Sequence, residues 1–489
     1  MTTSSTALRR AALGTVMPGF AGDSVPDWLV GLLGEGLGGV CLFASNITSS
    51  GGVRALTAQL RDAGPDVVIA VDEEGGDVTR LWHHAGGSAQ PGNAVLGRLD
   101  DEEVTACAAR TLATELRAVG VTVTFGPVAD VNSNPDNPVI GTRSFGTEPD
   151  LVARHVATWV RALQEGGVAA CTKHFPGHGD TATDSHLTLP VVDRSAAELT
   201  TRELLPFAAA VRAGVEAVMT SHILLPRIDP HAPATMSAPV IDGLLRTDLG
   251  FEGVVVTDAL DMAGASGRLG MAGAAVAALA AGADLLCLGA ENTAAEVEEI
   301  VDAVTAAVRE GRLSEERLSA ACRRNRGLAG RYPAPADLTE PARSGAVVPT
   351  ARIAATFELS SRARDLLARS GRVLLVRLDS VPNIAVGPGR WGPFELVPAS
   401  QVLTAEGALE AARTSLAPED VLVVVGRDNH LHPSSREMID TLRSAHAATL
   451  VVDMGWARAD AGLADVATYG ASPAVGRALL ELLKAGGPA

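Results

Sequence analysis

The first two thirds of the chain repeat one pattern, in which a short apolar run ends at a polar residue or a glycine and a helix-like stretch follows. Runs that are apolar at nearly every position are typical of parallel strands buried on both faces. About eight such units occur, which is the number that a (β/α)8 barrel of the TIM type needs. The runs lie near Leu13–Val16 and at Val40–Phe43, Val67–Val71, Val121–Phe125, Val168–Cys171, Ala217–Met219, Val254–Val256 and Asp284–Leu288.

An open, doubly wound sheet is the alternative architecture for this pattern. Such sheets often bind a dinucleotide at a Gly-x-Gly-x-x-Gly turn after the first strand, and no such turn follows the first run here. We therefore expect a barrel without a dinucleotide and predict no cofactor.

The last third of the chain has a different organisation. Residues 331–350 are rich in proline and poor in apolar residues, which indicates a linker. Beyond it, apolar runs alternate with helix-like stretches, which predicts a smaller α/β layered domain of the Rossmann or flavodoxin type. We expect a barrel at 1–330, the linker at 331–350 and the second domain at 351–489. The predicted strands are Val373–Leu378, Val421–Val425, Thr449–Val452 and Ala464–Tyr469, and the predicted helices are Ser435–His446 and Ala474–Lys484.

Polar residues follow the predicted strands of the barrel at their carboxyl ends. In a (β/α)8 barrel these ends converge on one mouth, where active sites form. The residues concerned are far apart in the sequence, yet the fold would bring them to one pocket. They are Asp72, Asp130, Lys173, His174, His222 and Asp258.

Composition narrows the classes of partner. The 489 residues include 40 Lys and Arg against 57 Asp and Glu, a net charge of −17, and no basic stripe appears. This disfavours a nucleic-acid or anionic-membrane binder. The five cysteines are scattered and no signal peptide is recognisable, so we expect a cytoplasmic protein with reduced thiols. The apolar window 271–290 is interpreted as an Ala-rich helix followed by a buried strand, since Gly282 and Asp284 interrupt it.

The loop from Lys173 to His186 is the most informative segment. It follows an apolar run, is broken by proline and glycine, and ends on Asp184 and His186. A carboxylate bonded to an imidazole fixes its tautomer and raises its basicity, so this pair is suited to proton transfer. A metal site using the histidines of this loop is the alternative. Its spacing matches no tight zinc pattern and Lys173 would repel the cation, so we predict no metal.

Asp258 follows the β-branched run Val254–Val256 directly. A carboxylate at that position of a barrel mouth is suited to a nucleophile or a general base. It is equally suited to capping the helix that follows, because Asp is a favoured N-cap residue. The spacing alone leaves both interpretations open.

Positive charge from Arg80, Arg143 and Lys173 would meet the carboxylates of Asp72 and Asp258 at the mouth. Mixed charge suits polyhydroxylated ligands, because each hydroxyl both donates and accepts hydrogen bonds. For either arginine taken alone, a structural ion pair is the alternative.

Together these segments resemble glycoside hydrolase family 3, and within it the β-N-acetylglucosaminidase branch. Residues 173–186 are similar to the signature Lys-His-Phe/Ile-Pro-Gly-His/Asp-Gly, four residues, Asp-Ser/Thr-His. The segments 72–80, 137–145, 219–223 and 256–262 support the resemblance, which covers roughly residues 10–330.

The resemblance implies a role for each matching residue. Asp258 would be the nucleophile that forms a glycosyl-enzyme, and His186 the acid/base paired with Asp184. The N-acetylglucosamine (GlcNAc) would be held by Asp72, Arg80, Arg143, Lys173 and His174. The family segment usually reads Asp-Gln-Glu-Gly-Gly-Arg, whereas Glu73 and Asp77 stand here in place of Gln and Arg, which alters the charge around the site.

The function that we expect is that of a retaining exo-β-N-acetylglucosaminidase acting on a GlcNAc glycoside. Retaining glycosidases normally use two carboxyl groups roughly 5 Å apart. A histidine acid becomes neutral after donating its proton, so phosphate could act as acceptor with less repulsion. A β-N-acetylglucosaminide phosphorylase is therefore the first alternative. A non-catalytic sugar-binding protein and a plain β-glucosidase of the same family are the others.

Overall fold

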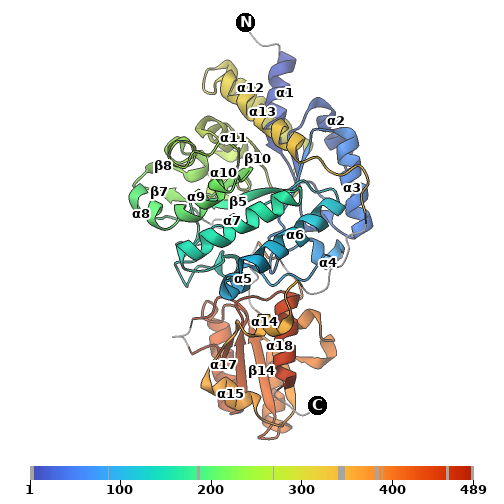
Figure 1. The fold of residues 1–489 in the computed structure, drawn as a ribbon, viewed down its shortest axis with the longest axis vertical. Coiled ribbons are helices and arrows are strands. Elements are labelled where there is room, and N and C mark those ends of the chain that lie inside the picture. Colours follow the sequence, from blue (N-terminus) through green and yellow to red (C-terminus); the bar gives the residue numbers. More distant parts are fainter. Residues whose placement is uncertain are drawn as a thin grey trace.

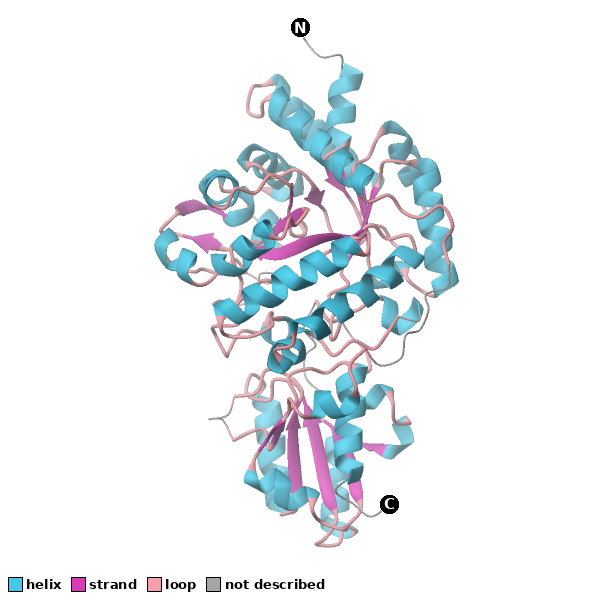
Figure 2. Ribbon diagram, in the orientation of Figure 1, coloured by secondary structure: helices cyan, strands magenta, loops and turns pink. Residues whose placement is uncertain are grey.

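The computed structural model describes residues 5–85, 87–183, 188–267, 269–339, 347–379, 385–387, 389–458 and 462–485. Figure 1 shows a larger N-terminal part, coloured blue to yellow, above a smaller C-terminal part in orange and red. Each part is built on a parallel sheet with helices packed around it (Figure 2).

In the described part of the chain, eight parallel strands form the barrel. Six of them pair in the order β2-β3-β4-β5-β6-β9, and β1 pairs with β10. A bridge between Val256 and Leu285 joins β9 to β10, and the amide of Cys41 donates to the carbonyl of Pro18, 3.0 Å away, beside β1. The ring therefore closes, and the predicted (β/α)8 barrel is confirmed. Its strands are β1 (Val16–Met17), β2 (Gly39–Leu42), β3 (Val68–Val71), β4 (Val123–Thr124), β5 (Ala169–Phe175), β6 (Ala217–Thr220), β9 (Val254–Val256) and β10 (Leu286–Cys287).

The strands are buried on both faces. Val68 and Ala70 of β3 belong to a cluster inside the barrel, whereas Ile69 and Val71 belong to the core under the surrounding helices. Side chains two apart in a strand point to the same face, so one apolar run supplies both cores. This double burial is why the runs are continuous and do not alternate with polar residues.

Helices connect the strands and cover the outside of the ring (Figure 1). The longer ones on the flank, α6 and α7, pack against each other with their apolar sides inward. A π-helix, Pro239–Asp248, precedes β9, and a short hairpin of β7 (Leu224–Leu225) and β8 (Asp229–Pro233) follows β6. The α-helices of this part are α1 (Ser5–Leu13), α2 (Asp27–Glu35), α3 (Ser50–Ala63), α4 (Leu81–Ala85), α5 (Asn93–Leu99), α6 (Glu102–Ala118), α7 (Pro149–Glu165), α8 (Ala196–Thr201), α9 (Leu204–Arg212), α10 (Ala263–Ser266), α11 (Gly270–Ala281), α12 (Ala294–Arg309) and α13 (Glu315–Arg331).

The apolar window at 271–290 folds as the sequence predicted. α11 covers its first half, Gly282 ends the helix in a left-handed conformation, and β10 follows. Helices long and apolar enough to cross a membrane do not occur among the described residues.

The C-terminal part is a smaller α/β layer domain. Its sheet has the order β13-β12-β14-β15-β16-β11, with every pair parallel except the edge pair β11–β16. Without the edge strand β11, this is the 2-1-3-4-5 order of flavodoxin-like sheets, so the predicted fold class is confirmed. Its elements are α14 (Thr350–Ala354), β11 (Glu358–Leu359), α15 (Ser361–Leu367), β12 (Val373–Arg377), β13 (Val402–Leu403), α16 (Ala405–Thr414), β14 (Val421–Gly426), α17 (Pro433–Ala445), β15 (Thr449–Asp453), β16 (Val466–Ala467) and α18 (Pro473–Ala485).

The two-residue strands β11 and β13 were not predicted from the sequence, and the first barrel strand begins slightly later than predicted. Leu13 ends α1, and β1 begins at Val16. The proline-rich segment 331–350 lies between α13 and α14, and residues 340–346 of it lie outside the described residues.

Candidate active site

Three charged side chains continue the inward-facing rows of the barrel strands. Because residues two apart share a face, the first such residue beyond an apolar strand reaches the mouth of the barrel. An apolar strand therefore places a charged side chain at the pocket when that residue comes two positions after an inward-facing one. Ala70 precedes Asp72, Cys171 precedes Lys173 and Val256 precedes Asp258.

A cavity of about 330 Å³ lies at this mouth. Phe43, Phe125 and Met219 supply apolar wall to it, and Ala385 contributes to it from the C-terminal domain. Six of the residues predicted for the site line it together: Asp72, Arg80, Arg143, Lys173, His174 and Asp258.

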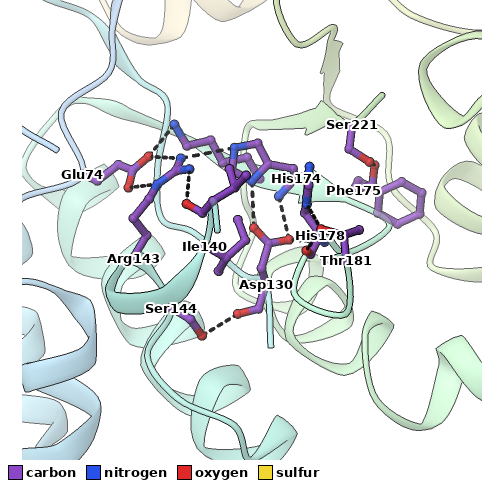
Figure 3. A network of polar contacts seen from close by, with 12 residues as sticks. Glu74, Asp130, Ile140, Arg143, Ser144, His174, Phe175, His178, Thr181 and Ser221 are labelled. Carbon is purple, nitrogen blue, oxygen red and sulfur yellow. Dashed lines mark hydrogen bonds and ion pairs between the residues drawn. The ribbon is translucent and has the colours of Figure 1, made fainter. Parts of the chain in front are cut away.

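Glu74 is the centre of the charged network at one side of the cavity. The Lys173 ammonium lies 2.6 Å from an Asp72 oxygen and 2.7 Å from Glu74 Oε1. The Arg143 guanidinium donates to both Glu74 oxygens, at 2.6 and 3.0 Å. Figure 3 shows Arg143 between Glu74 and His174. The two cations are thus held in fixed positions by one buried carboxylate.

His174 is oriented from both ring nitrogens. Arg143 Nη2 lies 3.3 Å from His174 Nε2, and Asp130 Oδ2 lies 2.7 Å from Nδ1. Since a guanidinium only donates, Nε2 accepts and Nδ1 carries the proton that goes to Asp130. The second oxygen of Asp130 accepts from the amides of His174 and His178 (Figure 3). Asp130 therefore fixes the start of the 173–186 loop.

The pKa values in this network follow from burial and charge. Burial alone would raise the pKa of Glu74, but Arg143 and Lys173 outweigh it and hold that pKa well below the usual range. Burial opposes the charge of Lys173, yet Asp72 and Glu74 raise its pKa above the ordinary value. Burial lowers the pKa of His178 to about 4, so this imidazole is neutral at pH 7. The wall beside the cavity thus combines fixed charges with a neutral ring.

Asp258 follows strand β9, on the side of the barrel away from β3, and is partly exposed to the cavity. Its Oδ1 accepts from the amide of Ala259, 2.8 Å away. The next helix, α10, begins only at Ala263 and has Met262 as its N-cap residue. The interpretation of Asp258 as a helix cap is therefore wrong, and its carboxylate is directed to the cavity instead.

Arg80 is held by its backbone and by its side chain. Glu73 Oε2 accepts from the amides of Arg80 and Leu81, at 2.7 and 2.8 Å, where α4 begins. The Arg80 guanidinium donates to the carbonyl of Ala385, 2.9 Å away, in the C-terminal domain. Burial raises the pKa of Glu73 to about 7. A barrel loop and the C-terminal domain therefore position this cation together.

Two residues expected to face the pocket lie behind it. Asp130 supports His174 and does not line the cavity. His222 is fully buried, and its Nε2 lies 3.0 Å from the carbonyl of Ala259, next to Asp258. Both residues were predicted because each follows a barrel strand. Their side chains support the site from behind and do not face the cavity. Asp184 and His186, the predicted proton-transfer pair, lie outside the described residues.

Two glycines of the 173–186 loop are buried by close packing. A Cβ at Gly179 would lie 1.8 Å from the carbonyl oxygen of Val131. Gly177 has a φ of +131°, and a Cβ there would lie 2.8 Å from the side chain of Glu203. At both positions packing leaves no room for a side chain, so only glycine fits there.

The model of the glycosyl hydrolase family 3 N-terminal domain matches residues 30–326, more than half of the chain. A β-hexosaminidase of Methylococcus capsulatus is 39% identical over 293 residues, which cover 59% of this chain and 85% of that protein. The chain belongs to glycosyl hydrolase family 3. A β-hexosaminidase A of Pseudoalteromonas piscicida is 35% identical, with 61% of this chain matching only 54% of that relative's length.

The family likeness extends over both domains in one solved structure. A family 3 β-N-acetylglucosaminidase from Paenibacillus sp. FPU-7 superposes with a TM-score of 0.84 at 32% identity, and 98% of each chain is covered. The C-terminal domain of this family 3 chain is therefore part of an architecture that this solved structure shares.

The structure shows what contacts the two residues that depart from the usual family segment make. Glu73 accepts two amide hydrogen bonds at the start of α4. Asp77 accepts from Thr142 Oγ1, 2.9 Å away, and from the amide of Ala471 in the C-terminal domain, 2.7 Å away. In this family 3 member, position 77 thus links the barrel to its second domain.

Glu74 belongs to the site but was not among the residues that the sequence predicted for it. It was visible as the third residue of the segment 72–80, but three acidic residues in a row leave open which of them points inward. The usable signal was the presence of two cations, Lys173 and Arg143, that had to be balanced in a buried site.

Proposed function

We propose that this protein is a retaining exo-β-N-acetylglucosaminidase. The observation that carries the proposal is the cavity at the barrel mouth, where Asp258 lies across from the charged network of Lys173, Glu74 and Arg143. A carboxylate facing a set of fixed donors and acceptors is the arrangement that a glycosidase needs to hold a sugar and attack its anomeric carbon.

The size of the cavity supports action on a chain end. Its volume of about 330 Å³ is at the lower end of the range of about 300–1,000 Å³ for small-molecule sites. A cavity of this size accommodates one sugar ring, and Ala385 narrows it from the side of the C-terminal domain. We therefore infer that a single terminal residue enters, with the rest of the substrate outside.

The reaction would proceed in two displacements. The Asp258 carboxylate attacks the anomeric carbon, and the bond to the leaving oxygen breaks as His186 donates its proton to that oxygen. Neutral His186 then takes a proton from water, and the resulting hydroxide displaces Asp258 and yields GlcNAc. The assignment of His186 and of its partner Asp184 rests on the sequence signature. Asp72, Arg80, Arg143, Lys173 and His174 would bind the sugar.

The activity of Asp258→Ala tests this proposal. We expect hydrolysis of an aryl β-GlcNAc glycoside to fall by about 10³-fold or more, because the covalent step is lost. Turnover near that of the wild type would rule out Asp258 as nucleophile. The matched control is Asp261→Asn, which removes a second carboxylate that lines the same cavity and is expected to cost far less.

Product analysis in the presence of phosphate distinguishes a hydrolase from a phosphorylase. With a β-GlcNAc disaccharide and millimolar phosphate, the proposal predicts free GlcNAc as the only product derived from the terminal sugar. Accumulation of GlcNAc 1-phosphate would instead identify phosphate as the acceptor. Binding of GlcNAc without any turnover would favour a sugar-binding protein.

A further inference from the structure

A hollow of about 330 Å³ lies between helix α13 and the start of strand β9. Strand β9 runs from Val254, which lines this hollow, toward Asp258 at the active-site cavity, so the two spaces lie at opposite ends of the barrel. Leu328 of α13 packs into the apolar cluster inside the barrel, so this helix covers the end away from the mouth. Figure 1 shows α13 on the side of the barrel that is far from the C-terminal domain. We refer to this space as the basal hollow.

Three arginines of α13 line the basal hollow, and a glycine lies between them. Arg323 and Arg324 lie about one helical turn before Gly327, and Arg331 lies one turn after it. Residues four apart are neighbours on one face of a helix, so these side chains surround the glycine. A Cβ at Gly327 would lie 3.2 Å from the guanidinium of Arg331. The glycine therefore leaves room for a ligand between the arginines.

Arg323 and Arg324 have donors that the protein does not use. Arg323 is exposed, and across the residues that the structure describes no hydrogen bond or ion pair of its guanidinium is found. Arg324 donates from one nitrogen to Asp284 Oδ1, 3.1 Å away. Arg331, by contrast, is paired through two nitrogens with Glu216, at 2.5 and 3.1 Å. Since a guanidinium has five N–H donors, the first two arginines can bind a further acceptor.

The carboxylate beside Arg324 already balances two other arginines. Arg246 and Arg317 each approach an Asp284 oxygen to 2.6 Å, whereas Arg324 lies 3.1 Å away. One carboxylate cannot neutralise three cations. Burial lowers the pKa of Arg246, and repulsion from Arg324 and Arg317 lowers it further, despite the attraction of Asp284. Of these three cations, Arg324 is therefore the least compensated.

Positive charge is in excess around the basal hollow although the whole chain carries a net charge of −17. The charged lining residues and their ion-pair partners comprise five arginines and three carboxylates. They are Arg246, Arg317, Arg323, Arg324 and Arg331, with Glu216, Glu252 and Asp284. A local excess of about two charges matches a dianion. Because the acidic protein as a whole repels a polyanion, a small ligand fits better than a nucleic acid or an anionic membrane.

We propose that the basal hollow binds a dianionic phosphate group, free or carried by a small molecule, between Arg323 and Arg324. Phosphate oxygens accept hydrogen bonds from the forked donors of both guanidinium groups. A volume of about 330 Å³ is in the range of about 300–1,000 Å³ for small-molecule sites, so an organic part would fit beside Gly327. The site is separate from the barrel mouth and does not depend on the proposed glycosidase activity.

Calorimetric titration of the full chain measures this binding. The probes are inorganic phosphate and glycerol 3-phosphate, at constant ionic strength and above the second phosphate pKa of about 6. We expect one saturable site per chain. A lower Kd for glycerol 3-phosphate would identify an ester as the preferred ligand, and an equal or higher Kd would identify the free ion. The absence of saturable binding of either probe would overturn the proposal, as would the same heat from sodium chloride at equal ionic strength.

Variants of α13 locate the phosphate. Arg323→Gln and Arg324→Gln should each raise the Kd about tenfold or more, because each removes a charge-assisted hydrogen bond. Arg326→Gln is the matched control, since Arg326 is exposed on the same helix and does not line the basal hollow, and it should leave the Kd unchanged. A wild-type Kd in both Arg323→Gln and Arg324→Gln would place the anion elsewhere, such as at the barrel mouth, and would overturn the proposal.

Gly327→Glu tests the site without weakening the fold. It places a carboxylate between the arginines and removes a glycine from a helix interior, so the melting temperature should be equal or higher while phosphate binding is lost. Gly327→Ala is the control, because it makes the same change to the helix without adding charge, and it should retain binding. Phosphate binding to Gly327→Glu with the wild-type Kd would contradict the proposed site.

Discussion

Glu73 and Glu74 are adjacent and equally buried, yet their pKa values shift in opposite directions. Burial raises the pKa of Glu73 to about 7, because its partners are neutral amides. Glu74 contacts two cations, and their charge outweighs the same burial. For a single buried carboxyl group, the charge of the groups that it contacts, and not its degree of burial, decides whether it is ionised.

Glu73 makes stability depend on pH. The folded protein keeps a proton on Glu73 that the unfolded chain releases near pH 4.5, so this contribution is complete below pH 4.5 and is lost as pH rises through about 7. The loss amounts to about 3 kcal/mol, since one pKa unit corresponds to about 1.4 kcal/mol. We expect Glu73→Gln, which keeps an acceptor oxygen, to reduce the fall in melting temperature between pH 5 and pH 8. Equal falls in both proteins would contradict this account.

Glu74→Gln should have a larger and different effect. It leaves the buried charges of Lys173 and Arg143 without their shared carboxylate, which typically costs about 3–5 kcal/mol. We expect a lower melting temperature at all pH values and a raised KM for an aryl β-GlcNAc glycoside. A variant with wild-type KM would show that Glu74 does not position the two cations.

The secondary-structure elements place three charged residues of the site through the alternation of side chains along the strands. Asp72, Lys173 and Asp258 each come two residues after an inward-facing apolar residue. This much is readable from the sequence, because the apolar runs and the period of two are local properties. Glu74 is indicated only indirectly, by the two cations that a buried site must balance, and Ala385 is not readable, because its contribution depends on which segments meet across the fold. The two-residue strands β11 and β13 are too short to produce a pattern.

Gly179 fixes the start of the 173–186 loop against its neighbour. A methyl group there meets the Val131 carbonyl, so Gly179→Ala should destabilise the protein by about 1–3 kcal/mol through overpacking. Gly31→Ala is the matched control, because Gly31 is exposed in α2 with open space around it, and it should be neutral or slightly stabilising. Thermal unfolding of the two variants measures the difference. Equal melting temperatures would show that the loop yields at Gly179.

In the molecule as a whole, the C-terminal domain contributes to the candidate active site. The Ala385 carbonyl accepts from Arg80, and Asp77 of the barrel accepts from the amide of Ala471. The sequence predicted two domains but not their contact, since the contacting residues are far apart and two of the groups are backbone atoms. Asp77 stands in place of the usual family arginine, and its carboxylate accepts the hydrogen bond from the Ala471 amide that links the two domains.

The Asp77 contact can be followed by hydrogen exchange. In Asp77→Ala the amide of Ala471 loses its acceptor, so we expect faster exchange in the peptide that contains the start of α18. Asp77→Asn keeps an acceptor oxygen and should retain most of the protection, and peptides from α2 should be unchanged in both. Unaltered exchange around Ala471 in Asp77→Ala would mean that the domains are held together by other contacts.

Trapping the covalent intermediate tests directly whether Asp258 is the nucleophile. A fluorinated GlcNAc donor with a good leaving group slows the second displacement, so the sugar remains attached to the nucleophile. After digestion, mass spectrometry should find the added sugar on Asp258 and on no other residue. A sugar attached to another carboxylate, or turnover of the donor without any adduct, would contradict the account.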